Sequence, residues 1–254
     1  MTEGWHPQAC RGRPECLPRA TTWGCPYGDF WGICYPHSQG MRLLPKEKMG
    51  KIESVIFDWG GVLIDDPRPG LLRYCAGAFG VPLEHYTPVH DSFLDQFGKG
   101  LISEEEFWQG ISRKLGKPAP EVPSLWSEAF RSICVPRPEV FSLASSLHGK
   151  GYKTALLSNT ELPAVEFFHE MNYDMFDVLV FSCEQGVAKP ERRIYEIALE
   201  KLGSAAPQCV FIDDRQDYIE GAREAGLHTI LFKSVNQIRH ELAGLGVDKI
   251  RPKR

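Results

Sequence analysis

Several features are missing from this chain of 254 residues, and each absence argues against a class of function. The chain has no apolar run long enough to span a bilayer, and its amino terminus lacks the uninterrupted apolar stretch of a secretory signal. With a formal net charge of -4, it also lacks the positive excess typical of nonspecific nucleic-acid binding. We therefore expect a soluble, cytoplasmic protein without a nucleic-acid or membrane partner, whose oligomeric state the sequence does not indicate.

Helical or strand periodicity is missing from residues 1–48, although these residues hold four of the eight cysteines and three of the six tryptophans. Their cysteines form no Cys-x-x-Cys pair, so a zinc site has weak support, and disulfides are rare in a reducing cytoplasm. We interpret residues 1–48 as a disordered extension, or as a non-native upstream reading-frame segment with the functional start at Met49 or Met41. The alternative is a small metal-binding or disulfide-stapled appendage.

From Met49 onward, short apolar segments alternate with amphipathic helical segments. Strands separated by helices imply right-handed parallel crossovers. The sequence therefore predicts an α/β fold with a doubly wound, Rossmann-like parallel sheet, formed by a core of residues 49–66 and 139–254. Its strands are expected at residues 55–57, 153–157, 178–181, 209–212 and 229–232.

Residues 67–138 interrupt this alternation, because they contain amphipathic helical patterns and no convincing strand. The clearest helix begins with a capping box formed by Ser103 and Glu106, followed by apolar residues at four-residue spacing. We expect a helical cap, inserted after the first strand, that overhangs the strand ends.

The most informative segment is the end of the first predicted strand. Val55 to Phe57 are continuously apolar, as in a buried parallel strand, and are followed by Asp58 and by Gly60 and Gly61. Open parallel sheets bind ligands outside the carboxyl ends of their strands, so Asp58 is a candidate catalytic carboxylate. The alternative is an ordinary turn or helix-capping aspartate.

Two further strands lead into polar residues. Ser158 and Asn159 follow the second strand and precede a helix, where a hydroxyl, an amide and backbone N–H groups can hold phosphate. Lys189 follows the third strand, and we expect Pro190 to occupy the first position of the next helix. A lysine just before a helix N-terminus is disfavoured unless it meets an anion, which would be a carboxylate or a bound phosphate.

The fourth strand ends in Asp213 and Asp214, with Asp217 three residues further on. Adjacent carboxylates at the mouth of an apolar strand repel each other and are most easily tolerated around a hard cation. Mg²⁺ suits a site built from a few carboxylates, waters and substrate oxygens. Together, the four strand ends predict a nucleophilic carboxylate, an oxyanion site, a lysine and a Mg²⁺ site, which suits phosphoryl transfer to aspartate.

These segments, in this order, closely resemble the four motifs of the haloacid dehalogenase-like hydrolase superfamily. The resemblance covers residues 52–235, and the helical insertion is similar to the cap of subfamily I. The sequence looks closest to the branch of α-glucose-1-phosphatase and the amino-terminal phosphatase domains of epoxide hydrolases. It implies a Mg²⁺-dependent phosphatase that forms an aspartyl phosphate and acts on a small phosphorylated metabolite such as a sugar phosphate.

The resemblance also implies a role for each motif residue, as follows: Asp58 as nucleophile and metal ligand; Gly60, through its carbonyl, and Asp213 as further metal ligands; Asp214 and Asp217 in support of the metal site; Ser158 and Asn159 in phosphate binding; and Lys189 in phosphate binding and catalysis by offsetting charge.

One position departs from the pattern. Phosphatases of this superfamily usually carry a second aspartate two residues after the nucleophile, as general acid and base, and here that position is Gly60. A positioned acid/base contributes about 10²–10⁴-fold. The resemblance extends to this position, because the glucose-1-phosphatase branch also has glycine there. A leaving group that needs little protonation, or a carboxylate of the cap, would compensate for the missing acid/base. The alternatives are a non-catalytic phosphate-binding protein and a 2-haloacid dehalogenase, against which the Asp213–Asp214 pair argues.

Overall fold

The computed structural model describes residues 51–247 of the chain. Their centre is a five-stranded sheet in the order β3-β2-β1-β4-β5, in which every neighbouring pair is parallel. The strands are β1 (Ser54–Phe57), β2 (Lys153–Ser158), β3 (Val178–Phe181), β4 (Cys209–Asp213) and β5 (His228–Leu231). The expected doubly wound, Rossmann-like α/β fold is therefore confirmed.

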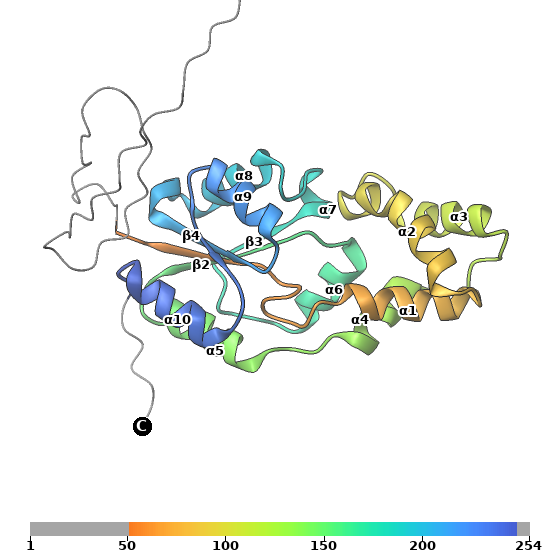
Figure 1. Cartoon of the computed structure of the whole chain (residues 1–254), viewed down its shortest axis with the longest axis horizontal. Coiled ribbons are helices and arrows are strands. Elements are labelled where there is room, and N and C mark those ends of the chain that lie inside the picture. Colours follow the sequence, from red (N-terminus) through yellow and green to blue (C-terminus); the bar gives the residue numbers. More distant parts are fainter. Residues whose placement is uncertain (1–50, 248–254) are drawn as a thin grey trace, which may run out of the picture. The chain divides into compact units, whose positions relative to one another are not determined.

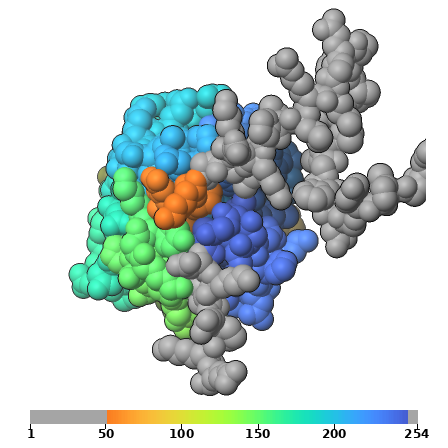
Figure 2. All heavy atoms as spheres, turned by 90° about the vertical axis from the view of Figure 1, so that its left-hand side faces the viewer, coloured from red at the N-terminus to blue at the C-terminus, as the bar shows by residue number. Residues whose placement is uncertain are grey.

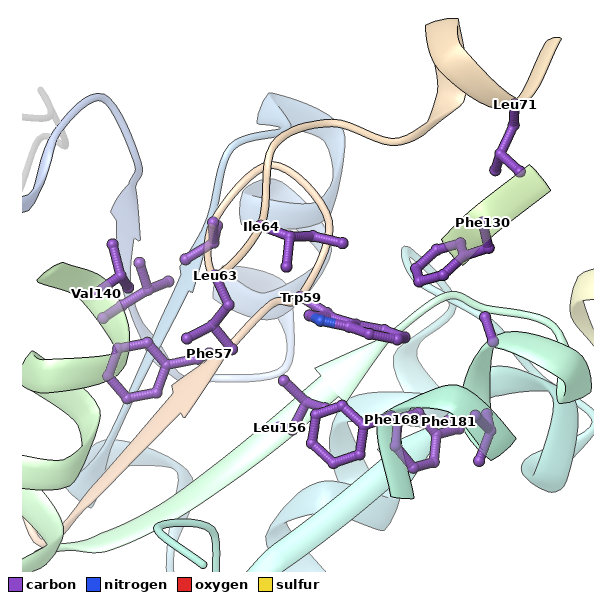
Figure 3. Close-up of a cluster of buried hydrophobic side chains, with 14 of the residues drawn as sticks. Phe57, Trp59, Leu63, Ile64, Leu71, Phe130, Val140, Leu156, Phe168 and Phe181 are labelled. Carbon is purple, nitrogen blue, oxygen red and sulfur yellow. The ribbon is translucent and has the colours of Figure 1, made fainter. Parts of the chain in front are cut away.

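Successive residues of the central strands bury their side chains on opposite faces of the sheet. On β1, Val55 and Phe57 join one buried cluster and Ile56 joins the other. Strands covered on both faces need apolar residues at every position, which explains the continuous apolar runs of the sequence. Figure 3 shows the first cluster, where Phe57 of β1 and Leu156 of β2 lie near the start of the loop that carries Trp59.

Helices cover both faces of the sheet (Figure 1). The first face packs against α5 (Pro138–His148) and α10 (Val235–Gly244), and the second against α8 (Arg192–Leu202) and α9 (Gln216–Glu224). The remaining core elements are the helices α6 (Leu162–Glu170) and α7 (Ser182–Gln185) and the 3-10 helix η2 (Ala206–Gln208).

Four helices lie between β1 and α5 in the sequence. They are α1 (Arg68–Phe79), α2 (Leu83–Gly98), α3 (Glu104–Leu115) and α4 (Leu125–Ile133), and we call them the cap helices. In Figure 1 they lie beyond the carboxyl ends of the strands, whereas Figure 2 views the opposite end, where the residues just before β1 reach the surface (orange). The loops that follow the strands therefore face the cap helices.

Most predicted elements agree with the structure to within one or two residues. The capping box of Ser103 and Glu106 is present at the start of α3, with the Glu106 amide donating to Ser103 Oγ over 3.2 Å. One local prediction is wrong: Pro190 does not begin a helix, because α8 starts at Arg192 with Glu191 as its N-cap. The predictions for residues 1–48 lie outside the described residues. Within residues 51–247, no helix is long and apolar enough to cross a membrane.

Candidate active site

The pairing of β1 with β4 brings two aspartates together. Phe57 lies opposite Ile212 in the parallel register, and the Asp58 amide donates to the Ile212 carbonyl over 2.9 Å. Asp58 and Asp213 therefore follow neighbouring strands at the same edge of the sheet. Both are buried, with exposed fractions of 5% and 0%.

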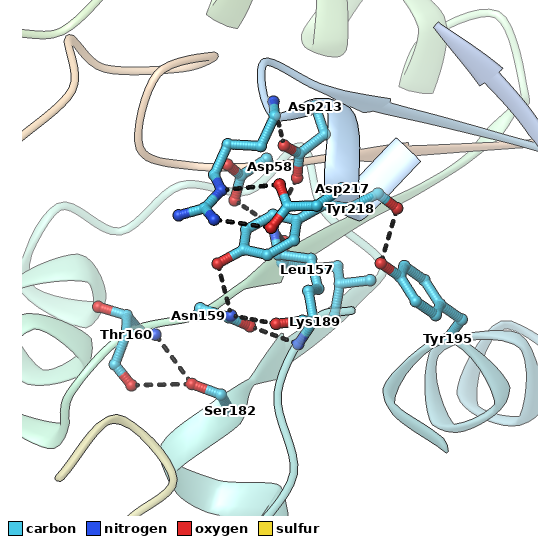
Figure 4. A network of polar contacts seen from close by, with 11 residues as sticks. Asp58, Leu157, Asn159, Thr160, Ser182, Lys189, Tyr195, Asp213, Asp217 and Tyr218 are labelled. Carbon is cyan, nitrogen blue, oxygen red and sulfur yellow. Dashed lines mark hydrogen bonds and ion pairs between the residues drawn. The ribbon is translucent and has the colours of Figure 1, made fainter. Parts of the chain in front are cut away.

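Lys189 lies between these two carboxylates (Figure 4). Its ammonium nitrogen is 2.7 Å from Asp58 Oδ1 and 2.7 Å from Asp213 Oδ2, and it donates to the Leu157 carbonyl over 3.1 Å. The lysine is buried, so it needs these partners. Of the two anions expected for Lys189, the structure places carboxylates beside it, and the reasoning from a helix N-terminus at Pro190 is wrong.

Burial and charge act against each other in this cluster. Burial raises the pKa of Asp58 to about 7, although the Lys189 ammonium opposes this and Asp213 adds to it. Burial alone would lower the pKa of Lys189, but Asp213 and Asp58 outweigh it and hold the pKa above its usual value. Lys189 is therefore positively charged near neutral pH.

The donor set fits a hard divalent cation. Asp58, Asp213 and Asp214 each offer a carboxylate oxygen, and these oxygens lie within 4.8 Å of one another. One lysine cannot neutralise three carboxylates. Burial raises the pKa of Asp214, and repulsion from Asp213 raises it further. Carboxylate oxygens with room for water and substrate are the ligands that Mg²⁺ prefers. These residues therefore fit the Mg²⁺ that the sequence led us to expect.

The loop after β1 must pass very close to Asp214. Gly61 has a φ of 87°, and a Cβ added to it would lie 2.2 Å from Asp214 Oδ2. Only glycine combines that backbone conformation with such an approach. Gly60, the candidate carbonyl ligand, lines the same pocket as Asp58.

Ser158 and Asn159 lie at the end of β2, next to Asp58. Ser158 is buried and lines the pocket. The Asn159 side chain forms two hydrogen bonds with the backbone of Lys189. Its NH₂ group donates to the Lys189 carbonyl over 2.9 Å, and its Oδ1 accepts the Lys189 backbone N–H over 2.8 Å. The asparagine therefore positions Lys189, besides the phosphate contact that the resemblance implies.

Asp217 lies apart from the three carboxylates of the candidate metal site. Its carboxylate accepts two hydrogen bonds from the Arg215 guanidinium, at 3.1 and 2.7 Å. Arg215 in turn donates its backbone N–H to Asp213 Oδ1 over 2.9 Å and stacks on Tyr218 at 4.2 Å. Asp217 thus acts through Arg215 in this structure, and its support of a metal ion stays a prediction.

A cavity of about 600 Å³ lies between the strand ends and the cap helices. Its core wall includes Asp58, Ser158 and Lys189. Its cap wall combines apolar side chains with polar ones: Leu71, Leu94, Trp126 and Phe130 on one hand, and Arg68, His90, Asp91 and Asp95 on the other. Trp59, on the loop after β1, connects the core wall with the cap wall, because its ring packs on that of Phe130 of α4 with centroids 5.1 Å apart (Figure 3).

No sequence pattern singled out the polar cap residues. Asp91 accepts from the Arg68 guanidinium at 2.9 and 3.0 Å and lies 3.1 Å from His90 Nδ1. Burial lowers the pKa of His90 despite Asp91, so the ring is neutral near pH 7. Tyr218 was also missed; its hydroxyl accepts from the Asn159 amide over 3.1 Å. Such residues follow no fixed spacing, so only the fold brings them to the pocket.

The sequence profile of the haloacid dehalogenase-like hydrolases matches residues 52–226. This match covers well over half of the chain, and the chain therefore belongs to the haloacid dehalogenase-like hydrolase family, as its four motifs predicted. The comparison with solved structures agrees with this assignment. A family enzyme of Bacteroides thetaiotaomicron, solved as an aspartate-to-alanine mutant with magnesium and inorganic phosphate, has a TM-score of 0.63 and 27% identity over 72% of this chain and 94% of its own.

Two curated relatives illustrate the range of similar proteins. Mouse acyl-CoA dehydrogenase family member 10 is 30% identical over 93% of this chain, and the sesquiterpene phosphatase of Aspergillus oryzae is 25% identical over 69% of it. The chain spans 23% of the mouse relative's length, 87% of the fungal one's and 37% of that of rat bifunctional epoxide hydrolase 2, which also matches. The mouse alignment covers more than residues 49–254 could supply, so it extends into the N-terminal segment.

Proposed function

We propose that the protein is a Mg²⁺-dependent phosphomonoesterase that forms an aspartyl phosphate on Asp58. The observation that carries the proposal is the buried Asp58–Lys189–Asp213 cluster at the strand ends, open to the cavity and flanked by Asp214. The related enzyme with bound magnesium and phosphate supports the same chemistry.

Several residues of the chain have separate roles in the first chemical step, the attack of Asp58 on the phosphoryl group. Lys189 holds one oxygen of the Asp58 carboxylate at 2.7 Å, which fixes the orientation of the nucleophile. Ser158, on the adjacent strand, lines the cavity where a phosphoryl oxygen would bind. The Lys189 charge would also offset negative charge on that phosphoryl group. Asp58, Asp213, Asp214 and the Gly60 carbonyl would hold Mg²⁺, which as a Lewis acid stabilises the transferring phosphoryl group.

The cavity favours a small organic phosphate. Its volume of about 600 Å³ suits a metabolite-sized ligand, and the apolar side chains of its cap wall favour esters with carbon surface to bury. Sugar phosphates, expected from the sequence, and terpenyl phosphates, suggested by the name of the fungal relative, are the two ends of that range. A cytoplasmic location remains part of this proposal.

The test is phosphate release by the full chain from p-nitrophenyl phosphate, sugar phosphates and prenyl phosphates, with Mg²⁺ or with EDTA. We expect Mg²⁺-dependent release that Asp58→Asn abolishes, because the amide cannot act as the nucleophile. The matched control is Asp65→Asn, since Asp65 pairs with Arg137 and does not line the cavity.

A second candidate function is phosphate binding without turnover. It is favoured by Gly60, which stands where a general acid and base is usually found. In that case Mg²⁺ and inorganic phosphate would raise the melting temperature of the wild-type protein together, while no ester in the panel would be hydrolysed. That result would contradict the phosphatase proposal.

A further inference from the structure

Four carboxylates line the cavity outside the candidate metal site: Asp66, Asp91, Asp95 and Glu161. Hydrolysis of an alkyl phosphate needs a proton for the leaving alkoxide, and Gly60 cannot supply it. A residue that gives this proton must carry it near neutral pH and must reach the cavity. The surroundings of the four carboxylates decide which of them meets both conditions.

Three of the four carboxylates are poorly suited to hold a proton. Asp66 is exposed and accepts the Arg68 backbone N–H over 3.0 Å. Asp91 pairs with the Arg68 guanidinium at 2.9 Å, and its pKa is lowered because these hydrogen bonds outweigh burial. Asp95 is 73% exposed at its side chain and pairs with Lys99 at 2.8 Å. Each of them therefore already has a hydrogen-bond donor or a cation beside its carboxylate.

Glu161 differs in its contacts. It follows Ser158, Asn159 and Thr160 on the loop after β2 and is the N-cap residue of α6. Within residues 51–247, its side chain has no hydrogen bond or ion pair with another residue. Its Oε1 lies 3.6 Å from where a Cβ on Gly98 would be, so the carboxyl faces the end of α2 at the boundary between core and cap. It is therefore the partnerless carboxyl of the cavity.

Burial keeps Glu161 protonated near neutral pH, and no neighbouring cation among residues 51–247 offsets it. Burial raises its pKa to about 8, and its own backbone N–H only partly opposes this. On α7, burial raises the pKa of the Cys183 thiol to about 12, and Glu161 and Glu184 add to this. Lys99, the residue after α2, forms ion pairs with Asp95 and Glu191. Across the cavity, Lys189 is engaged by Asp58 and Asp213.

We propose that Glu161 is the general acid and base of this enzyme, in the role that Gly60 leaves open. This inference rests on the proposed phosphatase function. Asp58 forms a bond to phosphorus as the bridging P–O bond breaks, and the Glu161 proton passes to the departing oxygen, which leaves as an alcohol. The Glu161 carboxylate then takes a proton from the water that attacks the aspartyl phosphate, which releases inorganic phosphate and restores Asp58 and protonated Glu161.

The experiment compares Glu161→Gln with wild type on an alkyl phosphate and on p-nitrophenyl phosphate, measuring kcat/KM against pH with Mg²⁺ present. Glutamine keeps the shape but cannot transfer a proton. We expect the alkyl ester to lose about 10²–10⁴-fold in kcat/KM, while p-nitrophenyl phosphate, whose leaving group needs little protonation, changes by less than about threefold. The wild-type fall of alkyl kcat/KM above about pH 8 disappears in the variant, because only protonated Glu161 acts as the acid.

Two further variants make the result specific. Glu166→Gln alters an exposed glutamate on the same helix and leaves both esters unchanged. Glu161→Asp keeps a carboxyl one carbon shorter, so it keeps the fall at high pH with a smaller loss of rate. Equal losses on both esters, or a high-pH fall that persists in Glu161→Gln, would overturn the assignment. Phosphate release that survives Asp58→Asn would instead overturn the proposed function itself.

Discussion

The two walls of the cavity hold their charges in different ways. On the core wall, Lys189 and Asp58 are 2.7 Å apart with side chains only 1% and 8% exposed. On the cap wall, Arg68 and Asp91 are 2.9 Å apart with side chains 44% and 41% exposed. A buried pair is costly to break because the remaining charge stays desolvated, whereas an exposed pair contributes little.

This difference separates the proposed chemistry from the proposed selectivity. Asp58 and Asp213 lie at the ends of strands whose positions are set by backbone hydrogen bonds to their neighbours, and Lys189 is held between these two carboxylates. The cap wall consists of helices that contact the core through individual side chains. One of them is Ser182 of α7, whose hydroxyl accepts the Thr160 amide over 2.9 Å and donates to the Gly98 carbonyl over 2.5 Å. Changes in the core should therefore affect every ester, and changes in the cap should depend on the ester.

The largest effect is expected for Lys189→Met. Removal of the cation leaves the Asp58 and Asp213 carboxylates without a neighbouring ammonium group in a buried site, which should lower the free energy of unfolding by about 3–5 kcal/mol. Phosphate release should be lost for every ester, since the nucleophile loses its orientation. Urea unfolding in EDTA and the ester panel measure the two effects.

The matched control for this substitution is Lys99→Met. Lys99 also contacts two carboxylates, Asp95 and Glu191, but both of these are largely exposed. Its loss should cost less than about 1 kcal/mol. If both variants lose similar stability, the contrast between buried and exposed pairs is wrong.

Gly61→Ala should have the next largest effect. A φ of 87° costs a non-glycine residue about 1–3 kcal/mol, and the new Cβ would collide with Asp214. Because Asp214 belongs to the candidate metal site, we expect a higher Mg²⁺ concentration for half-maximal activity. Gly77→Ala is the control, since Gly77 is in α1 and a Cβ there meets nothing within 4 Å. Unchanged Mg²⁺ dependence in Gly61→Ala would separate Asp214 from the metal.

The core wall could be predicted from the sequence because topology alone aligns strand ends. Once β1 and β4 are parallel neighbours, Asp58 and Asp213 must meet, and the apolar runs before them reveal both strands. The partners of Lys189 were harder to predict. Helix α8 starts two residues after Pro190, so Lys189 does not precede a helix directly, and its side chain reaches the Leu157 carbonyl of β2.

The cap wall could not be predicted to the same depth. Helix α2 was not recognised as an element, because Pro88 lies inside it and a proline usually ends a helical pattern. His90 and Asp91 follow Pro88 on that helix, so their positions in the cavity stayed hidden as well. Glu161 was missed because a glutamate after a strand end is ordinary, and only the absence of a partner makes it unusual.

Ser182→Ala tests the link between the two walls. It leaves the Thr160 amide and the Gly98 carbonyl without their hydrogen-bond partner, which should cost about 1–3 kcal/mol of stability. Because Gly98 ends a cap helix, we expect KM to rise more for esters that fill the cap side than for p-nitrophenyl phosphate. An equal change in KM for all esters would argue against a cap role in selectivity. Ser145→Ala, at an exposed site on α5, is the control.

The smallest expected effect is the pH dependence contributed by His90. Burial lowers its folded pKa below the unfolded value of 6.5, so the unfolded chain binds the extra proton first as pH falls. Its contribution to stability is therefore constant above about pH 6.5 and falls below it, with a slope of at most about 1.4 kcal/mol per pH unit. Carboxylates add their own dependence in the same range, so His90→Phe must be compared with wild type.

We expect the difference in free energy of unfolding between wild type and His90→Phe to move in favour of the variant from pH 6.5 to pH 5. Phenylalanine keeps an aromatic ring beside Trp126, on which His90 stacks with centroids 5.8 Å apart. His85→Phe changes an exposed histidine on the same helix and should show no such trend. A constant difference for His90→Phe would mean that Asp91 stabilises a charged His90 in spite of burial and Arg68, and the cap wall would then tolerate charge as the core wall does.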